Sequence, residues 1–297
     1  MVQSVIELEP LGTVPDRFPN ELVRLILEIS ARSDGKTALN IFLAVSGHDR
    51  KWIEPIVYAH IVIHSHRNAA LFLKVMPAKP RGFFATHVKS IAIGDSVTLQ
   101  QSRAILAGCS QSVVDFAVWG NTRNPTIFLP FIRSRTLRRL SLKAQHASEL
   151  SFPPTLLASL THLMVLDGPY SWFQMREAVR WTKWRETNNL EYRRATVLFR
   201  SLTHFGVCSK NWGSMQAILK VAVNLRYFLV IVPPNVKTNM IAHRIEEIGD
   251  RRVVLLQYSQ TVDNWDASAR GEESVWERAE KLVTEGYFTE YGRKWKH

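Results

Sequence analysis

The sequence of 297 residues has only two cysteines, Cys109 and Cys208, too few for the disulfide framework that stabilises small secreted domains. No apolar run approaches the roughly 18 to 20 residues that a transmembrane helix needs. The longest candidates, such as Phe228–Val232, have the length of a strand. The N-terminus, MVQSVIELEP, lacks a basic region followed by an apolar one and predicts no signal peptide. We therefore expect a soluble protein of the cytoplasm or nucleus with no membrane partner.

The sequence also lacks the short motifs that carry common catalytic chemistry. It contains no His-Glu-x-x-His, no Gly-x-Ser-x-Gly and no Cys-x-x-Cys pair. Gly35-Lys36-Thr37 is similar to the end of a phosphate-binding loop, but Ser30 stands where that loop needs its first glycine. Asp263 and Asp266 flank Trp265 in a stretch that we expect to be a loop, with no partner base. We therefore expect no catalytic residues and no cofactor.

Three histidines, His60, His64 and His66, alternate with Ile61 and Ile63. Residues two apart on a strand share one face, so this alternation predicts that the histidines lie on the outer face of one strand. Three imidazoles could bind zinc. Because no cysteine or carboxylate lies near them in the sequence, we expect surface histidines and no metal site.

The formal net charge of +12 is unusual for a chain with an otherwise ordinary composition. A basic surface attracts polyanions such as nucleic acid through the release of counterions. The alternative is a solvated surface that aids solubility. Lysine and arginine are spread along the chain, with only short clusters at Arg133–Arg139 and Arg293–Lys296. This dispersion favours the solvated surface and leaves nucleic acid as a possible but less favoured partner.

One pattern recurs along the chain: an apolar residue, two variable residues, an apolar residue, one variable residue and an apolar residue. Copies begin at positions 88, 113, 137, 160, 202 and 225, and weaker copies begin at Tyr58 and Asp250. The intervals are 25, 24, 23, 42, 23 and 25. Five of them match the period of about 20 to 29 residues of leucine-rich repeats. The last two apolar positions share one face of a strand, which only stacking on neighbouring copies can bury.

The segments between these copies indicate helices. Thr98–Leu106, Ser214–Val223 and Thr238–Ile248 carry apolar residues at helical spacing. Strand followed by helix at a constant period predicts an α/β fold, a right-handed leucine-rich-repeat-like solenoid with parallel strands. The asparagine that usually follows the strand in such repeats is mostly absent, so we expect irregular repeats. The interval of 42 holds an insert at 171–191, rich in tryptophan, arginine and lysine.

Strand alternation places a row of polar and aromatic side chains on the concave face, beside a central row of mostly small residues. Tyrosine and arginine often dominate the binding energy of protein interfaces. The two rows therefore predict a shallow groove for a protein segment, unless they are only exposed positions of the sheet. The candidate target-binding residues are Asp115, Trp119, Arg139, His162, His204, Tyr227 and Arg252, and the central row is Ala92, Ala117, Ser141, Met164, Gly206, Leu229 and Val254.

The segment before the repeats is predicted to be helical. Pro19 suits a first helical turn, and Glu21 suits the positive end of a helix. Leu22, Ile26 and Ile29 then form one apolar stripe, and further helices are expected at 37–46 and 49–57.

Residues 16–60 resemble the F-box family. The family pattern begins Leu-Pro-x-Glu-Leu, and this chain has Phe18-Pro19-Asn20-Glu21-Leu22. The whole chain is also similar to the mushroom-type fungal F-box-like proteins, including a late tryptophan-containing segment at Ser274–Glu280. The later family stretch of leucines, Val-Ser, Arg and Trp is matched by Leu39, Leu43, Val45, Ser46, Arg50 and Trp52.

This resemblance implies a substrate receptor of a cullin-based ubiquitin ligase. Residues 16–60 would bind a Skp-type adaptor, the solenoid at 61–270 would hold an unknown protein target, and 271–297 would form a helical cap or tail. The alternative is that the N-terminal helices only cover the exposed end of the solenoid. The adaptor-binding residues that the resemblance implies are Phe18, Pro19, Glu21, Leu22, Ile26, Leu27, Leu43, Val45 and Trp52.

Overall fold

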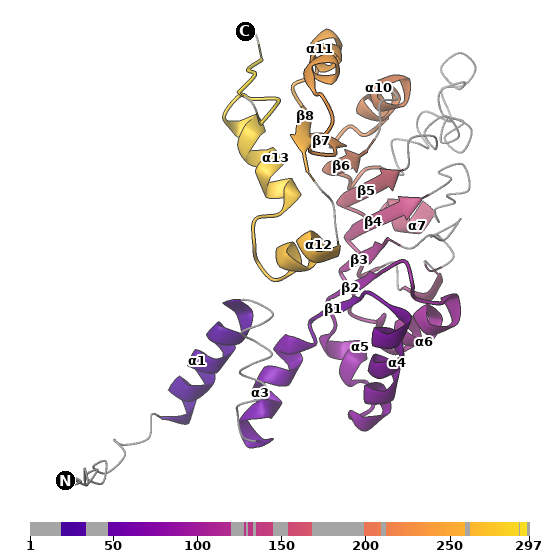
Figure 1. Cartoon of the computed structure of the whole chain (residues 1–297), viewed down its shortest axis with the longest axis vertical. Coiled ribbons are helices and arrows are strands. Elements are labelled where there is room, and N and C mark those ends of the chain that lie inside the picture. Colours follow the sequence, from indigo (N-terminus) through magenta and orange to yellow (C-terminus); the bar gives the residue numbers. More distant parts are fainter. Residues whose placement is uncertain are drawn as a thin grey trace, which may run out of the picture.

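The chain forms an α/β fold around one eight-stranded sheet in which all strands are parallel and follow the order of the sequence (Figure 1). The computed structural model describes residues 19–33, 47–119, 128, 130–132, 135–144, 154–167, 199–208, 212–258, 262–290 and 292–295. The strands are β1 (His60–Ile63), β2 (Ser90–Ile93), β3 (Asp115–Val118), β4 (Arg139–Ala144), β5 (His162–Asp167), β6 (His204–Val207), β7 (Tyr227–Val232) and β8 (Val253–Gln257).

The register of the sheet follows the sequence repeat. Ile91 of β2 pairs with Phe116 of β3, and Phe116 pairs with Leu140 of β4, so equivalent positions of successive copies lie side by side. The weaker copy that begins at Tyr58 contains β1. The prediction of parallel strands is confirmed, and their sequential order is compatible with a solenoid-like arrangement.

One face of the sheet is covered by the helices that connect the strands (Figure 1). The last two apolar positions of each repeat are buried there, together with helix residues such as Ile105, Ile218 and Ile245. The helix α6 begins with a capping box, because the Thr98 side chain accepts from the Gln101 backbone N–H and Gln101 reaches back. These helices are α4 (His66–Val75), α5 (Phe83–His87), α6 (Leu99–Cys109), α7 (Pro154–Leu157), α10 (Trp212–Val221) and α11 (Asn239–Ile248), with a short 3-10 turn at Met76–Ala78.

The opposite face, which the sequence predicted to be an open concave surface, is covered by the helices α12 (Val262–Ala269) and α13 (Val275–Thr284) (Figure 1). Trp265, Val275 and Ala279 of these helices form a second apolar cluster with the central row of the sheet. The prediction of a loop around Trp265 is therefore wrong. The physical reason is that most of the central row is apolar, and burying it against the chain's own C-terminal helices removes it from water.

The N-terminal helices α1 (Asn20–Ser33) and α3 (Gly47–Val57) form a pair at the β1 end of the sheet (Figure 1). The carbonyl of Pro19 accepts from the backbone N–H groups of Leu22 and Val23 in the first turn of α1, at 2.9 and 3.1 Å. Ala31 and Ile53 form the buried centre of the pair. The predicted helix over 37–46 and the insert at 171–191 lie outside the described residues.

The segment after α13 returns to the last strand. Phe288 is buried in the main core, and its carbonyl accepts from the backbone N–H of Leu255 at 2.8 Å. Leu255 also forms a parallel bridge with Thr289. The C-terminal segment thereby covers part of the edge of β8, which would otherwise offer unpaired backbone groups to other chains.

We expect Phe288→Ala to lower the free energy of unfolding by about 3–5 kcal/mol, because it removes a large buried ring and leaves a cavity. Urea titration of the full chain measures this loss. Met240→Ala, at a side chain that is 86% exposed, is the control and should change the stability by less than about 0.5 kcal/mol. A loss of under about 1 kcal/mol for Phe288→Ala would contradict the placement of the tail in the core.

Candidate functional site

Stacked rings on β5, β6 and β7 form the centre of the covered face. The rings of His162 and His204 are stacked, with centroids 4.0 Å apart and planes within 7°. Tyr227 stacks on His204 at 4.7 Å. The Trp276 ring of α13 meets both histidines edge-on, at 5.2 and 5.6 Å. These contacts fit the preferred geometries of aromatic pairs and join α13 to the sheet.

Gly206 of β6 makes room for this tryptophan. A Cβ atom at Gly206 would lie 2.6 Å from Sδ of Met164 and 3.1 Å from Cη2 of Trp276. The absence of a side chain at this position therefore allows Trp276 to approach the sheet closely. We call the surroundings of Trp276, formed by His162, Met164, His204 and Gly206, the tryptophan socket.

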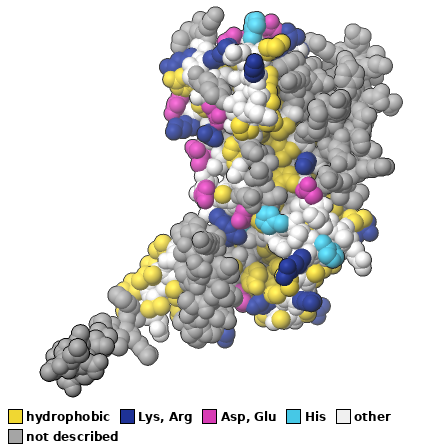
Figure 2. Space-filling model, in the orientation of Figure 1, with side chains coloured by type: hydrophobic (Ala, Val, Ile, Leu, Met, Phe, Trp, Pro, Cys, Tyr) yellow, Lys and Arg dark blue, Asp and Glu magenta, His cyan; other side chains and the backbone are white. Residues whose placement is uncertain are grey.

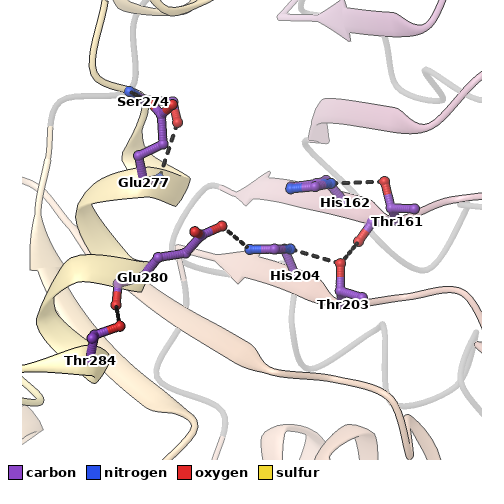
Figure 3. Close-up of polar contacts among 8 residues, drawn as sticks. All are labelled: Thr161, His162, Thr203, His204, Ser274, Glu277, Glu280 and Thr284. Carbon is purple, nitrogen blue, oxygen red and sulfur yellow. Dashed lines mark hydrogen bonds and ion pairs between the residues drawn. The ribbon is translucent and has the colours of Figure 1, made fainter. Parts of the chain in front are cut away.

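A hydrogen-bonded chain fastens α13 beside the socket (Figure 3). Nε2 of His204 lies 2.8 Å from Oε1 of Glu280, and Nδ1 lies 2.8 Å from Oγ1 of Thr203. The Thr203 hydroxyl also lies 3.1 Å from the Thr161 carbonyl, but that carbonyl already accepts two backbone N–H groups. The hydroxyl can therefore donate to Nδ1, which leaves the Nε2–H of a neutral His204 to donate to Glu280.

Burial favours the neutral form of both histidines. Burial lowers the pKa of His162 to about 3, with smaller contributions from the charges of His204 and Arg139. Burial also lowers the pKa of His204, although Glu280 opposes this effect. Two neutral imidazoles can stack at this distance without the repulsion that two imidazolium ions would have.

A polar cleft lies next to the socket, between the sheet and the two C-terminal helices. At its base, Nε of Arg139 lies 2.9 Å from Oδ2 of Asp115, whose side chain is only 9% exposed. Burial raises the pKa of Asp115 to about 6, although Arg139 and the Trp265 side chain act in the opposite direction. The cleft encloses about 400 Å³, including the part open to solvent. The sheet contributes Asp115, Arg139, Leu140, Ser141 and His162, and the C-terminal segment contributes Tyr258, Asn264, Trp265, Ser268, Val275 and Trp276.

The structure brings several predicted target-binding residues together but does not expose them as predicted. Asp115, Trp119 and His204 are buried. The Trp119 ring meets the Trp265 ring edge-on at 6.0 Å, beneath α12. The prediction of an open groove along this row is therefore wrong, because side chains of the C-terminal helices α12 and α13 cover it.

Arg252 has a different role from the one predicted. Its guanidinium donates to both carboxylate oxygens of Asp250, at 2.9 and 2.6 Å, and to the carbonyl of Leu219 in α10 at 2.9 Å. Burial alone would raise the pKa of Asp250, but the hydrogen bonds and charge of Arg252 outweigh it and lower the pKa. Arg252 therefore braces the turn before β8 against a connecting helix and does not face the cleft.

The three predicted outward-facing histidines do not share a strand. The strand β1 ends at Ile63, and His66 begins α4. His60 is half-buried near α12, where Arg270 donates to its carbonyl at 3.3 Å. Burial and the charge of Arg270 lower the pKa of His60 to about 4. No three His, Cys, Asp or Glu side chains of the described residues form a group that could hold a metal ion.

Sequence reasoning missed the residues that α12 and α13 contribute, above all Trp265, Trp276 and Glu280. One available signal was the capping box at Ser274 and Glu277 (Figure 3), whose two hydrogen bonds are 3.1 and 2.7 Å long. This motif marks the start of an amphipathic helix that needs an apolar partner. The sequence did not indicate that the partner is the central row of the sheet.

Comparisons with known proteins found no family model, no curated protein and no solved structure that matches this chain. Within the part of the chain that the structure describes, no helix has the length and apolar character needed to cross a membrane. The function is therefore argued from the geometry and from the sequence resemblance.

We expect the free energy of unfolding to fall as the pH is lowered from about 6.5 toward 4. His162 and His60 have lowered pKa values of about 3 and about 4 in the fold, whereas an unfolded histidine titrates near 6.5, so the unfolded chain binds more protons in this window. Asp115 has the opposite effect on stability. Its pKa is raised to about 6 in the fold, whereas an unfolded aspartate titrates at about 3.9, so between these values the folded chain binds more protons and acidification favours folding.

Urea titrations at pH 7.5 and 5.0 measure this effect. The loss of stability on acidification should be smaller for His162→Gln than for the natural chain. His243→Gln is the matched control, because the His243 side chain is 72% exposed, and it should retain the full loss. Equal losses in all three proteins would show that His162 is not buried in the neutral form.

Proposed function

We propose that this chain is a non-enzymatic protein-binding receptor, the substrate-recognition subunit of a Skp/cullin-type ubiquitin ligase. In this proposal the strand–helix units are irregular leucine-rich repeats, and the N-terminal helices are an F-box-like segment that binds the adaptor. The period of 23 to 25 residues and the resemblance of residues 16–60 to the F-box family support it.

The exposed apolar face of α1 is the observation that carries the proposal. Leu22, Leu25, Ile26 and Ile29 are 45%, 52%, 52% and 59% exposed. Figure 2 shows hydrophobic side chains along this helix, at the lower left of the view. Large apolar side chains gathered on one exposed face mark an interaction site more often than an inert surface.

The other face of α1 has a structural task. Leu27 packs on the buried pair of Ala31 and Ile53, so the helix is held by α3 on this side. Trp52 of α3 is half-buried, and the guanidinium of Arg24 lies 6.0 Å from its ring centroid. Among the implied adaptor-binding residues, Leu22 and Ile26 are thus available to a partner, whereas Leu27 and Trp52 support the helix pair.

Of the remaining implied adaptor-binding residues, Pro19 and Glu21 are exposed at the start of α1. Phe18, Leu43 and Val45 lie outside the described residues. The capping alternative explains α1 less well, because a helix that only covers the end of a solenoid should turn its apolar face to the sheet. Among the described elements, α1 instead packs chiefly against α3.

The basic charge of the chain supports a nucleic-acid partner less well than the apolar face of α1 supports a protein partner. Several arginines of the described surface pair with carboxylates, as Arg24 does with Glu28, Arg244 with Glu247 and Arg278 with Glu290. The face in Figure 2 shows Lys and Arg interspersed with Asp and Glu. A dispersed and partly neutralised surface is a weaker attractant for polyanions than a continuous basic patch.

We expect the full chain to co-purify with a Skp-type adaptor and the double substitution Leu22→Asp/Ile26→Asp to abolish the complex, because two carboxylates would be buried in an apolar interface. Met240→Asp is the matched control: it places the same charge on an exposed apolar residue of α11 and should leave the complex intact. The measurement is size-exclusion chromatography of the co-expressed proteins. A complex that survives the double substitution, or no complex with the natural chain, would refute adaptor docking by this face.

A further inference from the structure

A target of the proposed receptor has to bind away from the concave face. Trp265, Val275 and Ala279 cover the central row of the sheet there, so no polypeptide segment can lie along it. The connecting helices turn their inner sides to the main core and their outer sides to solvent. The outer side of α4, the first of these helices (Figure 1), is the surface whose charge stands out.

The chain has no acidic residue between Glu54 and Asp95. This stretch, which holds β1, α4, α5 and β2, lies entirely within the described residues. Its basic residues are Arg67, Lys74, Lys79, Arg81 and Lys89. Lys79 pairs with Glu54, but within the described residues no carboxylate pairs with any of the others. Arginines on later helices have carboxylate partners, as Arg270 has Asp266. The strand–helix unit around α4 therefore has an excess of positive charge that its own side chains do not neutralise.

The outer side of α4 combines two cations with an apolar side chain. Arg67, Leu71 and Lys74 are four and three residues apart, so they lie on one side of the helix, opposite to the buried Ala69. Arg67 and Lys74 are exposed, and Leu71 between them is 54% exposed. At a rise of about 1.5 Å per residue, the two cations are about 10 Å apart along the helix. We call Arg67, Leu71 and Lys74 the basic strip.

Two more cations extend the positive charge beyond the end of α4. Arg81 is exposed in the turn before α5, and Lys89 is exposed directly before β2. The Lys89 ammonium donates to the carbonyl of Thr86 at 3.1 Å, which uses one of its three N–H donors. The basic strip is therefore part of a wider positive field that attracts an anionic partner.

The basic strip suits an acidic polypeptide better than a nucleic acid. Phosphates would use the cations but not Leu71, whose exposed side chain is stabilised when an apolar group covers it. Single-stranded nucleic acid also uses aromatic rings on which its bases stack. Phe72 and Phe83 are half-buried and meet Phe84 edge-on, at 5.1 and 5.2 Å, so these rings belong to the packing of the core.

We propose that the basic strip binds an acidic amphipathic segment of the target, in which an apolar side chain lies between two carboxylates about 10 Å apart. The carboxylates pair with Arg67 and Lys74, and the apolar side chain covers Leu71. A helix with acidic residues seven apart and a leucine between them has this spacing. Exposed ion pairs contribute little to affinity, so the apolar contact strengthens binding while the cations select against basic segments. Because the segment belongs to the target of the proposed receptor, this assignment rests on the proposed function.

Fluorescence anisotropy with the full chain, at about 150 mM NaCl, tests this assignment. The probes are labelled synthetic helices of three heptads in an Ala/Gln background. The Glu/Leu helix has Glu at the first and Leu at the fifth position of each heptad; the Glu/Ser helix replaces Leu by Ser, and the Lys/Leu helix replaces Glu by Lys. The Glu/Leu helix should bind saturably, at least about fivefold more tightly than either of the others. No saturable binding of the Glu/Leu helix, or an affinity that another helix equals, would overturn the proposal.

Charge reversal locates the binding on the chain. Arg67→Glu/Lys74→Glu places carboxylates opposite those of the probe, so the affinity for the Glu/Leu helix should fall at least about tenfold. Lys237→Glu/Lys281→Glu is the matched control, because it changes the net charge equally at two exposed lysines outside the basic strip. The control should keep the affinity within about twofold. Equal losses in the two proteins would show a general effect of charge and contradict the assigned surface.

Substitution of the apolar residue tests the second element of the basic strip. Leu71→Ser removes the exposed apolar side chain from the solvent side of α4, so the Glu/Leu helix should bind no more tightly than the Glu/Ser helix. A preference for the Glu/Leu helix that survives this substitution would contradict the role of Leu71.

A labelled oligothymidylate distinguishes the acidic polypeptide from nucleic acid. It should bind the natural chain more weakly than the Glu/Leu helix does. Tighter binding of the oligothymidylate, lost in Arg67→Glu/Lys74→Glu, would make the basic strip a nucleic-acid site and refute the proposal. Adaptor co-purification depends on the apolar face of α1 and should survive Arg67→Glu/Lys74→Glu, so failure of the basic strip and failure of adaptor docking are distinguishable.

Discussion

The burial of the second face of the sheet by the chain's own C-terminal helices is the constraint on which the rest of the structure depends. The parallel strands of this sheet carry apolar residues on both faces, and the connecting helices among the described residues cover one of them. The central row from Ala92 to Val254 needs a second layer, which Trp265, Val275 and Ala279 supply. Trp276 and Glu280 fix the position of this layer. Trp276 enters the tryptophan socket, where Gly206 leaves room for its ring, and Glu280 forms a hydrogen bond with His204.

This second layer determines which surfaces remain for partners. Within the described residues, Asp115 and His204 of the polar row are buried beneath this layer, and a cleft lined by Asp115 and Arg139 lies beside them. The helix α1, which carries the exposed apolar side chains, lies at the opposite end of the molecule from the C-terminus (Figure 1). The proposed receptor would thus hold its adaptor-binding helix away from the covered face of the sheet, which offers no broad groove over its described central row.

Much of the fold could be predicted from the sequence, because repeat spacing reports the register directly: Ile91, Phe116 and Leu140 occupy equivalent positions and do pair. The helix that begins at His66 was missed, since the alternation before it extended the predicted strand too far. The burial of Asp115 could not be inferred locally, because it depends on Trp265, 150 residues further on. Repeat periodicity describes one unit and its neighbours and says nothing about a segment that folds back from the end of the chain.

The central claim is that the C-terminal helices α12 and α13 stay packed on the second face of the sheet. Hydrogen–deuterium exchange of the full chain, measured by mass spectrometry, tests this claim most directly. If α13 is packed on the sheet as described, the amides of Val275–Thr284 should exchange as slowly as those of β7 and β8. Exchange of α13 at the rate of an unfolded peptide, with β7 and β8 still protected, would contradict the account and return the concave face to solvent.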